Sequence, residues 1–497
     1  FDLTVRTPRP AQCVALQQTT NKNTHTETTE NHNAARIPGP PAPRSSFSVH
    51  PSSFPMKPSG VEWLGDIPEH WSGNRLKYSA TVNDEALGED TDPDYEMLYV
   101  DIGSVDAVDG IIKKEAMLFE NAPSRARRIV RDGDTIVSTV RTYLRAISPI
   151  KTPEPNLTVS TGFAVVRPRN ADPGFMAHAL RAPYFVESVV ARSVGVSYPA
   201  INASDLVDIG IPLPPLPEQR AIADFLDERT GKIDSLIARK RKLIDLLKEK
   251  RTALISRAVT KGLNPDVPMR PSGIDGSTSL TAGCLGDIPA HWDVVPMGYL
   301  CTIQTGVTLG KNHGSTELVE KPYLRVANVQ GGHLDLTEIK TILIPPSDWG
   351  RHELRHGDVL LTEGGDFDKL GRGHVWEGQI ESCLHQNHIF AVRPKKERLD
   401  SHFLARQLMS VHGRNYFTST SQQTTNLAST NSTKLKAFPV VLAPLSEQQA
   451  IADHLDQETA KIDKLIDKVE QAIEKLQEYR TALISAAVTG KIRVSDE

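Results

Sequence analysis

The stretch PPLPEQRAIADFLDERTGKIDSLI, which begins at Pro214, returns as APLSEQQAIADHLDQETAKIDKLI, which begins at Ala443. Within each copy, apolar residues recur at alternating spacings of four and three positions, which is typical of a helix with one apolar seam. The seam continues through RTALISRAVT at 251–260 and through its near copy RTALISAAVT at 480–489. The same long amphipathic helix is therefore expected twice in one chain.

The two seams use equivalent positions, which indicates how the helices pack. A single helix of this kind could bury its stripe against a globular domain, but two near copies favour antiparallel pairing about a pseudo-two-fold axis. With a rise of 1.5 Å per residue, a helix of about 40 residues forms a rod of roughly 60 Å that would hold two domains apart. The residues assigned to helix pairing are Ile233, Ile237, Ile244, Leu247, Leu254, Ile462, Ile466, Ile473, Leu476 and Leu483.

The expected ends of both helices carry ordinary start and stop signals. Pro217 suits a first helical turn, and Ser446 with Gln449 matches a capping box at the start of the second helix. Gly262 and Gly490 stand where the helices should end.

The duplication extends beyond the helices. MKPSG at 56–60 is echoed by MRPSG at 269–273, and LGDIPEHW at 64–71 returns as LGDIPAHW at 285–292. A period between about 210 and 230 residues is too long for a solenoid, so it indicates a duplicated domain pair. Between these motifs the halves share only short strand-like segments, such as RDGDTIV at 131–137 and RHGDVLL at 355–361. The two domains are therefore expected to share one fold but to present different surfaces.

The predicted fold class is α+β, with two globular domains, each followed by a long helix, and with the two helices paired as an antiparallel coiled coil. The first 55 residues are rich in Thr, Asn, Pro and Ser and are expected to be a disordered or non-native extension, with Met56 as the natural start. The predicted boundaries are 1–55 for this extension, 56–213 for the first domain, 214–262 for the first helix, 263–284 for a linker, 285–442 for the second domain, 443–491 for the second helix and 492–497 for a tail.

Composition narrows the class of protein. Hydrophobic residues make up 39% and charged residues 24% of the chain, and no apolar run approaches the roughly 18 residues that a membrane span needs. Cys13, Cys284, Cys301 and Cys383 have no paired spacing, so a reducing cytoplasm and no membrane contact are expected. With a net charge of −4, any binding of nucleic acid must depend on local basic patches or on partner subunits.

Signals for catalysis are missing from the sequence. No Gly-rich phosphate loop ending in Gly-Lys-Ser or Gly-Lys-Thr, no GxGxxG and no Asn-Pro-Pro-aromatic tetrapeptide occurs, so no catalytic residue and no cofactor is assigned. The alternative is a metal-dependent nuclease built on Glu363, Asp366, Asp368 and Lys369. Zinc is disfavoured, because the spacing of His374, His385 and His388 around Cys383 matches no common ligand pattern.

Candidate DNA-binding residues lie in both globular domains. Arginine neutralises phosphate and can also bind guanine bidentately, while amide and hydroxyl groups suit adenine and phosphate. A solvated basic face or a simple polar loop is the alternative reading of both groups. In the first domain the candidates are Arg125, Arg127, Arg128, Arg131, Arg141, Tyr143 and Arg145. In the second domain they are Lys369, Arg372, Gln386, Asn387, Arg414, Gln422, Gln423 and Thr424.

The repeated motifs resemble those of the specificity subunits of Type I restriction and modification systems. LGDIPEHW and LGDIPAHW are similar to the openings of that family's target recognition domains, and PPLPEQRAIADFLD and APLSEQQAIADHLD to the beginnings of its spacer helices. RTALISRAVTKG and RTALISAAVTGK are similar to the ends of those helices. The resemblance extends from about Met56 to Ile492 and includes four motifs, each present twice.

The resemblance implies a non-catalytic protein in the cytoplasm of a bacterium or archaeon. Each domain would read half of a bipartite site in double-stranded DNA, while the helices set the gap and bind two methyltransferase subunits. S-adenosylmethionine would belong to those subunits, and ATP and Mg to the restriction and translocase subunits. A protein scaffold that does not bind DNA is the second alternative.

Overall fold

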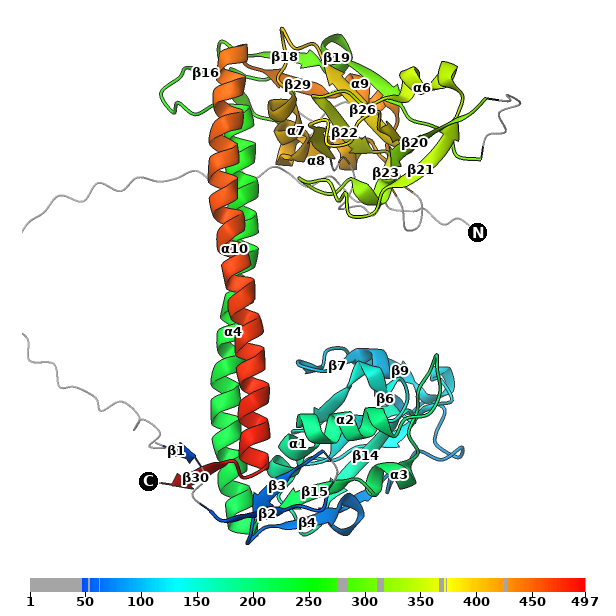
Figure 1. Ribbon diagram of the computed structural model, residues 1–497, viewed down its shortest axis with the longest axis vertical. Coiled ribbons are helices and arrows are strands. Elements are labelled where there is room, and N and C mark those ends of the chain that lie inside the picture. Colours follow the sequence, from blue (N-terminus) through cyan, green and yellow to red (C-terminus); the bar gives the residue numbers. More distant parts are fainter. Residues whose placement is uncertain are drawn as a thin grey trace, which may run out of the picture.

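Two long helices form the axis of the computed structural model, which describes residues 47–51, 54–61, 63–274, 285–310, 317–365, 371, 373–423 and 428–496. Helices α4 (Leu216–Lys261) and α10 (Leu445–Val488) lie side by side (Figure 1). One globular domain sits at each end of this helix pair, and both domains lie on the same side of it (Figure 1). A mixed α and β fold in two repeated halves is thus confirmed.

Two ion pairs between the long helices fix their relative direction. Arg251 Nε of α4 lies 2.9 Å from Asp463 Oδ1 of α10. Arg480 Nε of α10 lies 2.9 Å from Asp234 Oδ1 of α4. Asp234 precedes Arg251 in α4, whereas its partner Arg480 follows Asp463 in α10, so α4 and α10 run in opposite directions.

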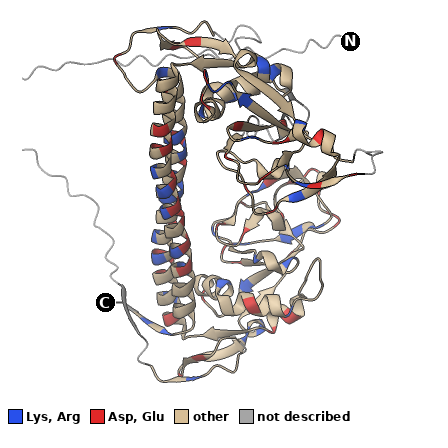
Figure 2. Ribbon diagram, turned by 45° about the horizontal axis from the view of Figure 1, so that its top comes forward, with Lys and Arg blue, Asp and Glu red and all other residues tan. Residues whose placement is uncertain are grey.

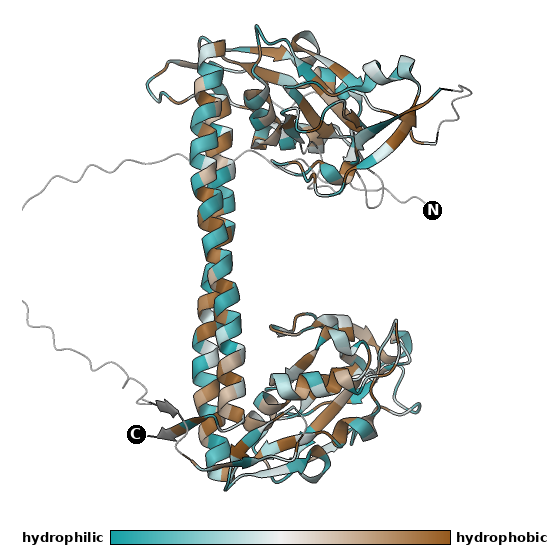
Figure 3. Cartoon of the chain, in the orientation of Figure 1, coloured by the Kyte–Doolittle hydropathy of each residue, from teal (hydrophilic) through white to brown (hydrophobic). Residues whose placement is uncertain are grey.

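The residues assigned to helix pairing contribute to more than one apolar cluster. In the middle of the rod, Ile244 and Leu247 pack with Ile462, Ile466 and Val469, where apolar and polar positions alternate along both helices (Figure 3). Towards the first domain, the seam joins that domain's own core. The members of that joint cluster from the two helices include Ile233, Ile237, Ile473, Leu476 and Leu483. Leu254, Ile473 and Leu476 are half-buried, whereas the other seven assigned residues are buried.

The first domain contains two four-stranded sheets. One has the order β12 (Ile147–Pro149), β11 (Thr135–Ser138), β14 (Phe163–Pro168), β5 (Ala80–Val82). The other has the order β10 (Ala126–Ile129), β13 (Leu157–Ser160), β6 (Glu96–Val100), β9 (Glu115–Leu118). Two-stranded pairs are β2 (Met56–Pro58) with β3 (Asp66–Pro68), β4 (Ser72–Arg75) with β15 (Gly210–Leu213), and β7 (Val105–Asp106) with β8 (Gly110–Ile111). Its helices are α1 (Pro173–Arg181), α2 (Pro183–Ala191) and α3 (Ala203–Val207).

The second domain repeats this plan with different additions. Its largest sheet has the order β19 (Cys301–Thr305), β26 (Ile389–Pro394), β22 (Asp358–Thr362), β24 (Gly373–Trp376). Three-stranded sheets are β21 (Lys340–Ile344), β20 (Val319–Leu324), β25 (Leu384–His385), and β23 (Gly364–Gly365), β28 (Ala428–Ser429), β27 (Gln422–Gln423). The pairs are β16 (Met269–Pro271) with β17 (Asp287–Pro289) and β18 (Asp293–Pro296) with β29 (Pro439–Leu442). Its helices are α5 (Met297–Leu300), α6 (Pro346–His352), α7 (Ser401–Met409), α8 (Val411–Thr420) and α9 (Ser432–Ala437).

Both domains are attached to the first turn of their own long helix by the same contact. The repeated His-Trp of LGDIPEHW and LGDIPAHW supplies it. Trp71 Nε1 donates to Glu218 Oε2 at 3.1 Å, and Trp292 Nε1 donates to Glu447 Oε2 at 3.0 Å. His70 and His291 contact the same carboxylates. Because both tryptophans are buried, these carboxylates satisfy indole N–H groups that water cannot reach.

A buried glutamine repeats the attachment one residue further along. Gln219 Oε1 accepts from the Asp172 N–H at 2.8 Å, and Gln448 Oε1 accepts from the Asp400 N–H at 2.8 Å. Asp172 and Asp400 also cap α1 and α7. The orientation of each domain on the rod is therefore set by side chains that occur in both copies.

Three sequence-based expectations need correction. Residues 47–51, which were assigned to the disordered extension, form strand β1 (Phe47–Pro51), which pairs with β30 (Ile492–Asp496) in the predicted tail. The predicted linker at 263–284 contains β16, which pairs with β17. Ser446 and Gln449 form no capping box, because α10 begins at Leu445 after Pro444 and no side chain caps it. Residues 1–46 lie outside the described residues.

Within the described ranges, the long helices are too polar to cross a membrane, and no other helix provides such a span.

Candidate nucleic-acid interface

The helix pair itself does not present a surface of one charge. Lys and Arg alternate with Asp and Glu along its exposed faces (Figure 2). The candidate DNA contacts are therefore expected on the two domains, which project from the same side of the helix pair (Figure 1).

The arginines before and after β10 are engaged within the first domain. Arg125 Nε donates to the Tyr99 hydroxyl at 3.2 Å and pairs with Asp101 at 3.3 Å, and these contacts raise the pKa of Arg125. Arg131 pairs with Glu85 at 2.8 Å. Much of the positive charge predicted to face DNA here is therefore neutralised locally.

The two arginines inside β10 are less accessible. The Arg127 guanidinium lies 4.5 Å from the ring centroid of Phe119. Arg128 is half-buried, and burial lowers its pKa. An aromatic contact and burial both hold these groups against the domain, so β10 is a weaker candidate than its composition indicates.

Arg141, Tyr143 and Arg145 are brought together around the short 3-10 turn η4 (Thr142–Leu144). Arg141 and Arg145 flank this turn in the left-handed region, with φ of 52° and 53°. Left-handed backbone is uncommon for a residue with a Cβ, and such outliers concentrate at binding sites. Tyr143 is exposed, and Arg145 pairs with Glu187 at 2.8 Å.

Sequence reasoning missed a neighbour of this turn. Residues 192–199, between α2 and α3, place Tyr198 so that its ring centroid lies 5.1 Å from the Arg141 guanidinium. Arg192, in the same segment, is exposed. The available signal was a Gly-, Ser- and Pro-containing segment with an arginine and no acidic residue, ARSVGVSYPA at 191–200.

In the second domain the candidate residues do not form one cluster. Gln386 and Asn387 are half-buried between β25 and β26, where their N–H groups donate to Leu324 O and Val307 O at 2.9 Å. Arg414 is exposed on α8. Gln422 and Gln423 form β27, but their side chains lie outside the described residues, as do Lys369, Arg372 and Thr424.

The carboxylate loop of the nuclease alternative is described only at its start. Glu363 Oε2 lies 2.6 Å from His388 Nδ1, while Asp366 and Asp368 lie outside the described residues. Across the described ranges, no three His, Cys, Asp or Glu side chains are grouped to hold a metal ion. Burial raises the pKa of the Cys383 thiol to about 12, which opposes its use as a metal ligand or nucleophile.

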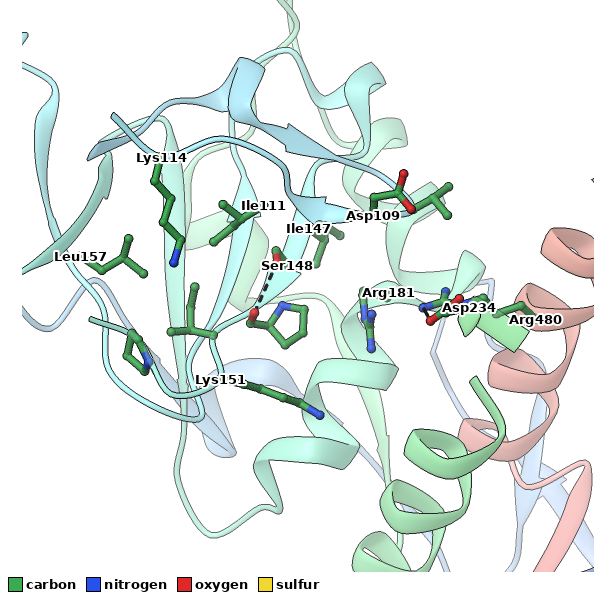
Figure 4. A pocket seen from close by; sticks show the side chains of 15 residues that line it. Asp109, Ile111, Lys114, Ile147, Ser148, Lys151, Leu157, Arg181, Asp234 and Arg480 are labelled. Carbon is green, nitrogen blue, oxygen red and sulfur yellow. Dashed lines mark hydrogen bonds and ion pairs between the residues drawn. The ribbon is translucent and has the colours of Figure 1, made fainter. Parts of the chain in front are cut away.

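A cavity of about 370 Å³ lies between the first domain and the helix pair (Figure 4). Arg181, Asp234 and Arg480 form its wall nearest the helices. Burial, followed by the charge of Arg480, lowers the pKa of Arg181 to about 10. Its lysines are already paired, Lys114 with Glu154 and Lys151 with Asp227. The cavity thus belongs to the junction between domain and rod and contains none of the candidate DNA contacts.

Comparisons with known proteins agree with this architecture. The family model for the Type I restriction modification DNA specificity domain matches residues 127–245 and 289–475, together more than half of the chain. The EcoKI specificity subunit of Escherichia coli K12 is 24% identical over 327 residues, which cover 64% of this chain and 65% of that subunit. The chain thus spans just under two thirds of the length of that relative.

Two further relatives match over longer stretches. The putative MjaX specificity subunit of Methanocaldococcus jannaschii is 26% identical over 455 residues, or 87% of this chain and 96% of that one. The chain also resembles a solved structure from a study of complex assembly and conformational transition of the type I R-M system. The two superpose with a TM-score of 0.60 at 24% identity, and the match covers 86% of this chain and 99% of that chain. With both halves of the chain matched by the family model, this protein belongs to the family defined by the Type I restriction modification DNA specificity domain.

Proposed function

We propose that this chain is the DNA-recognition subunit of a Type I restriction and modification complex, and that each domain reads one half of a bipartite site in double-stranded DNA. The observation that carries the proposal is that both domains are attached to their long helices by the same contact, although the rest of each domain differs. The Trp–Glu contacts at Glu218 and Glu447 are duplicated, whereas the two domains differ in sequence between the shared motifs and in the strands that make up their sheets. In this arrangement the helix pair holds two different DNA-binding domains at a fixed separation.

The helix pair acts in this proposal as an antiparallel coiled-coil spacer. The apolar cluster that contains Ile244 and Val469, together with the ion pairs of Arg251 and Arg480 on either side of it, supports a rod that resists bending. A rigid rod sets the distance between the two half-sites, because half-site spacing follows from the geometry of the protein.

The partners in this proposal carry the chemistry. Two methyltransferase subunits bind the rod and use S-adenosylmethionine, and restriction and translocase subunits use ATP and Mg. The chain itself is non-catalytic, binds no cofactor and acts in the cytoplasm. The near-neutral net charge of −4 supports this arrangement, since partners that close around DNA can supply phosphate contacts.

The test is to purify the full chain alone and with its methyltransferase partner, and to measure sequence-specific DNA binding together with genome-wide adenine methylation. We expect a split recognition site and preferential binding by the complex. Cleavage by the chain alone with a divalent ion would instead support the nuclease. A complex without sequence preference would support the scaffold.

A further inference from the structure

The segment between α2 and α3 exposes an apolar tip. Val196 is fully exposed, at 101% of its reference area, and Val194 and Tyr198 are 81% and 65% exposed. The segment projects from the first domain towards the gap between the domains (Figure 1). Exposed apolar side chains grouped in this way indicate a surface that is covered by a partner.

Charge around this tip favours an anionic partner. Residues 135–148 and 188–204 contain Arg141, Arg145 and Arg192 and no Asp or Glu. Arg145 is paired with Glu187, but across the described residues Arg141 and Arg192 have no ion pair. A partner that offers phosphates beside flat or methylated apolar groups fits this combination, and duplex DNA is such a partner.

Hydrogen bonds hold residues 192–199 in place. Thr142 Oγ1 donates to Ser193 Oγ at 2.7 Å, and the backbones of Val194 and Ala200 exchange two bonds of 2.9 and 3.0 Å. Gly195 has a φ of +117°, and a Cβ there would lie 3.2 Å from Tyr198 O. The turn is therefore ordered before any partner binds, which lowers the entropic cost of binding.

The second domain has a segment in the corresponding position. Ile201 N–H donates to Thr139 O at 2.9 Å, and Thr430 N–H donates to Glu363 O at 2.8 Å. The bridge between Val140 and Ala200 likewise corresponds to the pairing of β23 with β28. Since α8 and α9 flank this segment as α2 and α3 flank the first, the two segments are equivalent in the two halves.

The two equivalent segments differ in chemistry. The first reads ARSVGVSYPA at 191–200, and the second, SQQTTNLAST at 421–430, carries amide and hydroxyl side chains without charge. Base identity can be distinguished by apolar contacts as well as by hydrogen bonds, so a difference of this kind at equivalent positions suits two domains that bind different half-sites.

We propose that residues 192–199 form the base-contacting element of the first domain. Val196 and Tyr198 contact base edges or thymine methyl groups in the first half-site, and Arg141 and Arg192 contact the flanking phosphates. This inference rests on the proposed function and assigns its specificity to named residues.

The test uses the full chain assembled with its methyltransferase partner. A Val196→Ser, Tyr198→Ala variant is compared with Arg192→Gln and with Tyr78→Ala, an exposed tyrosine of the same domain that also lies beside a cation, Lys77. Binding is measured on duplexes substituted at each position of the recognised site and at several salt concentrations.

We expect the double variant to lose about tenfold or more of its discrimination at one or two positions of one half-site, with an unchanged salt slope. Arg192→Gln should weaken binding to all sequences equally and reduce the salt slope by about one. Tyr78→Ala should match the unsubstituted protein.

Unchanged discrimination by the double variant, or equal change in both half-sites, would overturn the inference. So would loss of methyltransferase assembly with unchanged sequence preference in the complexes that remain, because the tip would then be a protein-docking site. A complex of the unsubstituted chain without split-site preference would refute the proposed function itself, which separates the two failures.

Discussion

At the scale of single residues, the strand-like landmarks of the sequence contain a duplicated buried ion pair. Arg167 donates to both oxygens of Asp134 at 2.9 Å, and Arg393 donates to both oxygens of Asp358 at 2.6 and 2.7 Å. Asp134 and Asp358 are almost fully buried, so in each pair the arginine supplies the hydrogen bonds and the opposite charge that a buried carboxylate needs. The motifs predicted strands but not these pairs, because the register of β11 on β14 and of β22 on β26 is a long-range property.

Buried histidines make the second domain sensitive to acid. His385 is buried, and desolvation lowers its pKa to about 4. In the unfolded chain its pKa is about 6.5, so between pH 6.5 and pH 4 the unfolded state binds the proton and the folded state does not. Stability is therefore lost as the pH falls through this window. The contribution of His385 to that loss should reach about 3 kcal/mol.

Urea unfolding of His385→Asn at pH 7 and pH 4.5 measures this contribution. The variant should lose about 2 to 3 kcal/mol less than the unsubstituted chain over this interval. His356→Asn, which removes an exposed imidazole, is the control. Equal losses in all three proteins would mean that His385 is protonated in the folded state.

At the scale of elements, the long helices were predictable because their pattern is local. The expected spans 214–262 and 443–491 correspond to α4 at Leu216–Lys261 and α10 at Leu445–Val488. The cap was predicted wrongly because Pro444 already sets the start of α10. Around the proposed base-contacting element, the sequence indicated Arg141, Tyr143 and Arg145, which lie together at η4. It did not indicate Arg192 and Tyr198, because their segment joins that turn through the tertiary contacts Thr142–Ser193 and Arg141–Tyr198.

Two adjacent leucines of α4 allow a controlled test of the buried seam. Leu247 is 8% exposed within the helix-pair cluster, whereas Leu246 is 51% exposed. Leu247→Asp places an unpaired charge in the seam and should cost several kcal/mol, and adding Leu476→Asp should abolish assembly with the methyltransferase. Leu246→Asp should have little effect. Size-exclusion chromatography measures assembly with the methyltransferase, and thermal unfolding measures stability. Intact assembly of the Leu247→Asp, Leu476→Asp protein would argue against a buried coiled coil.

Strand β1 changes the expectation for the N-terminal extension. Its residues pair with β30, and the Phe54 ring lies 4.8 Å from the His70 ring and 5.2 Å from the Arg493 guanidinium, measured to ring centroids. Deletion of residues 1–46 should leave the melting temperature unchanged, since their composition cannot bury an apolar core. Deletion of residues 1–55 should lower it by several degrees, because it removes a strand and an aromatic contact. Identical melting temperatures for the two deletions would show that β1 contributes nothing to stability.

At the scale of the whole molecule, the two domains pack against different residues of the helix pair, within the part of the chain that the structure describes. The second domain rests on α10 through Glu447, Gln448 and Asp456, and on α4 through Ser256, whose hydroxyl accepts from the Val411 N–H at 2.9 Å. The first domain rests on α4 through Glu218, Gln219 and Asp227, and its core includes Leu483 and Val488 at the end of α10. Independent attachment implies that one domain can be exchanged without disturbing the other.

Replacement of residues 285–442 by the equivalent domain of a relative should therefore change one half of a bipartite methylation site and leave the other half unaltered. The incoming domain must supply a histidine and a tryptophan at the positions of His291 and Trp292, because Glu447 remains in the frame and needs both partners. The gap should persist at about 10 base pairs between half-site centres, since α4 and α10 are retained. Genome-wide adenine methylation measures all three features. The reciprocal exchange of residues 56–213 is the matched control and should change only the other half-site. A change in both half-sites after either exchange, or an unsplit site in the parent protein, would refute the proposal that the two domains recognise their half-sites independently.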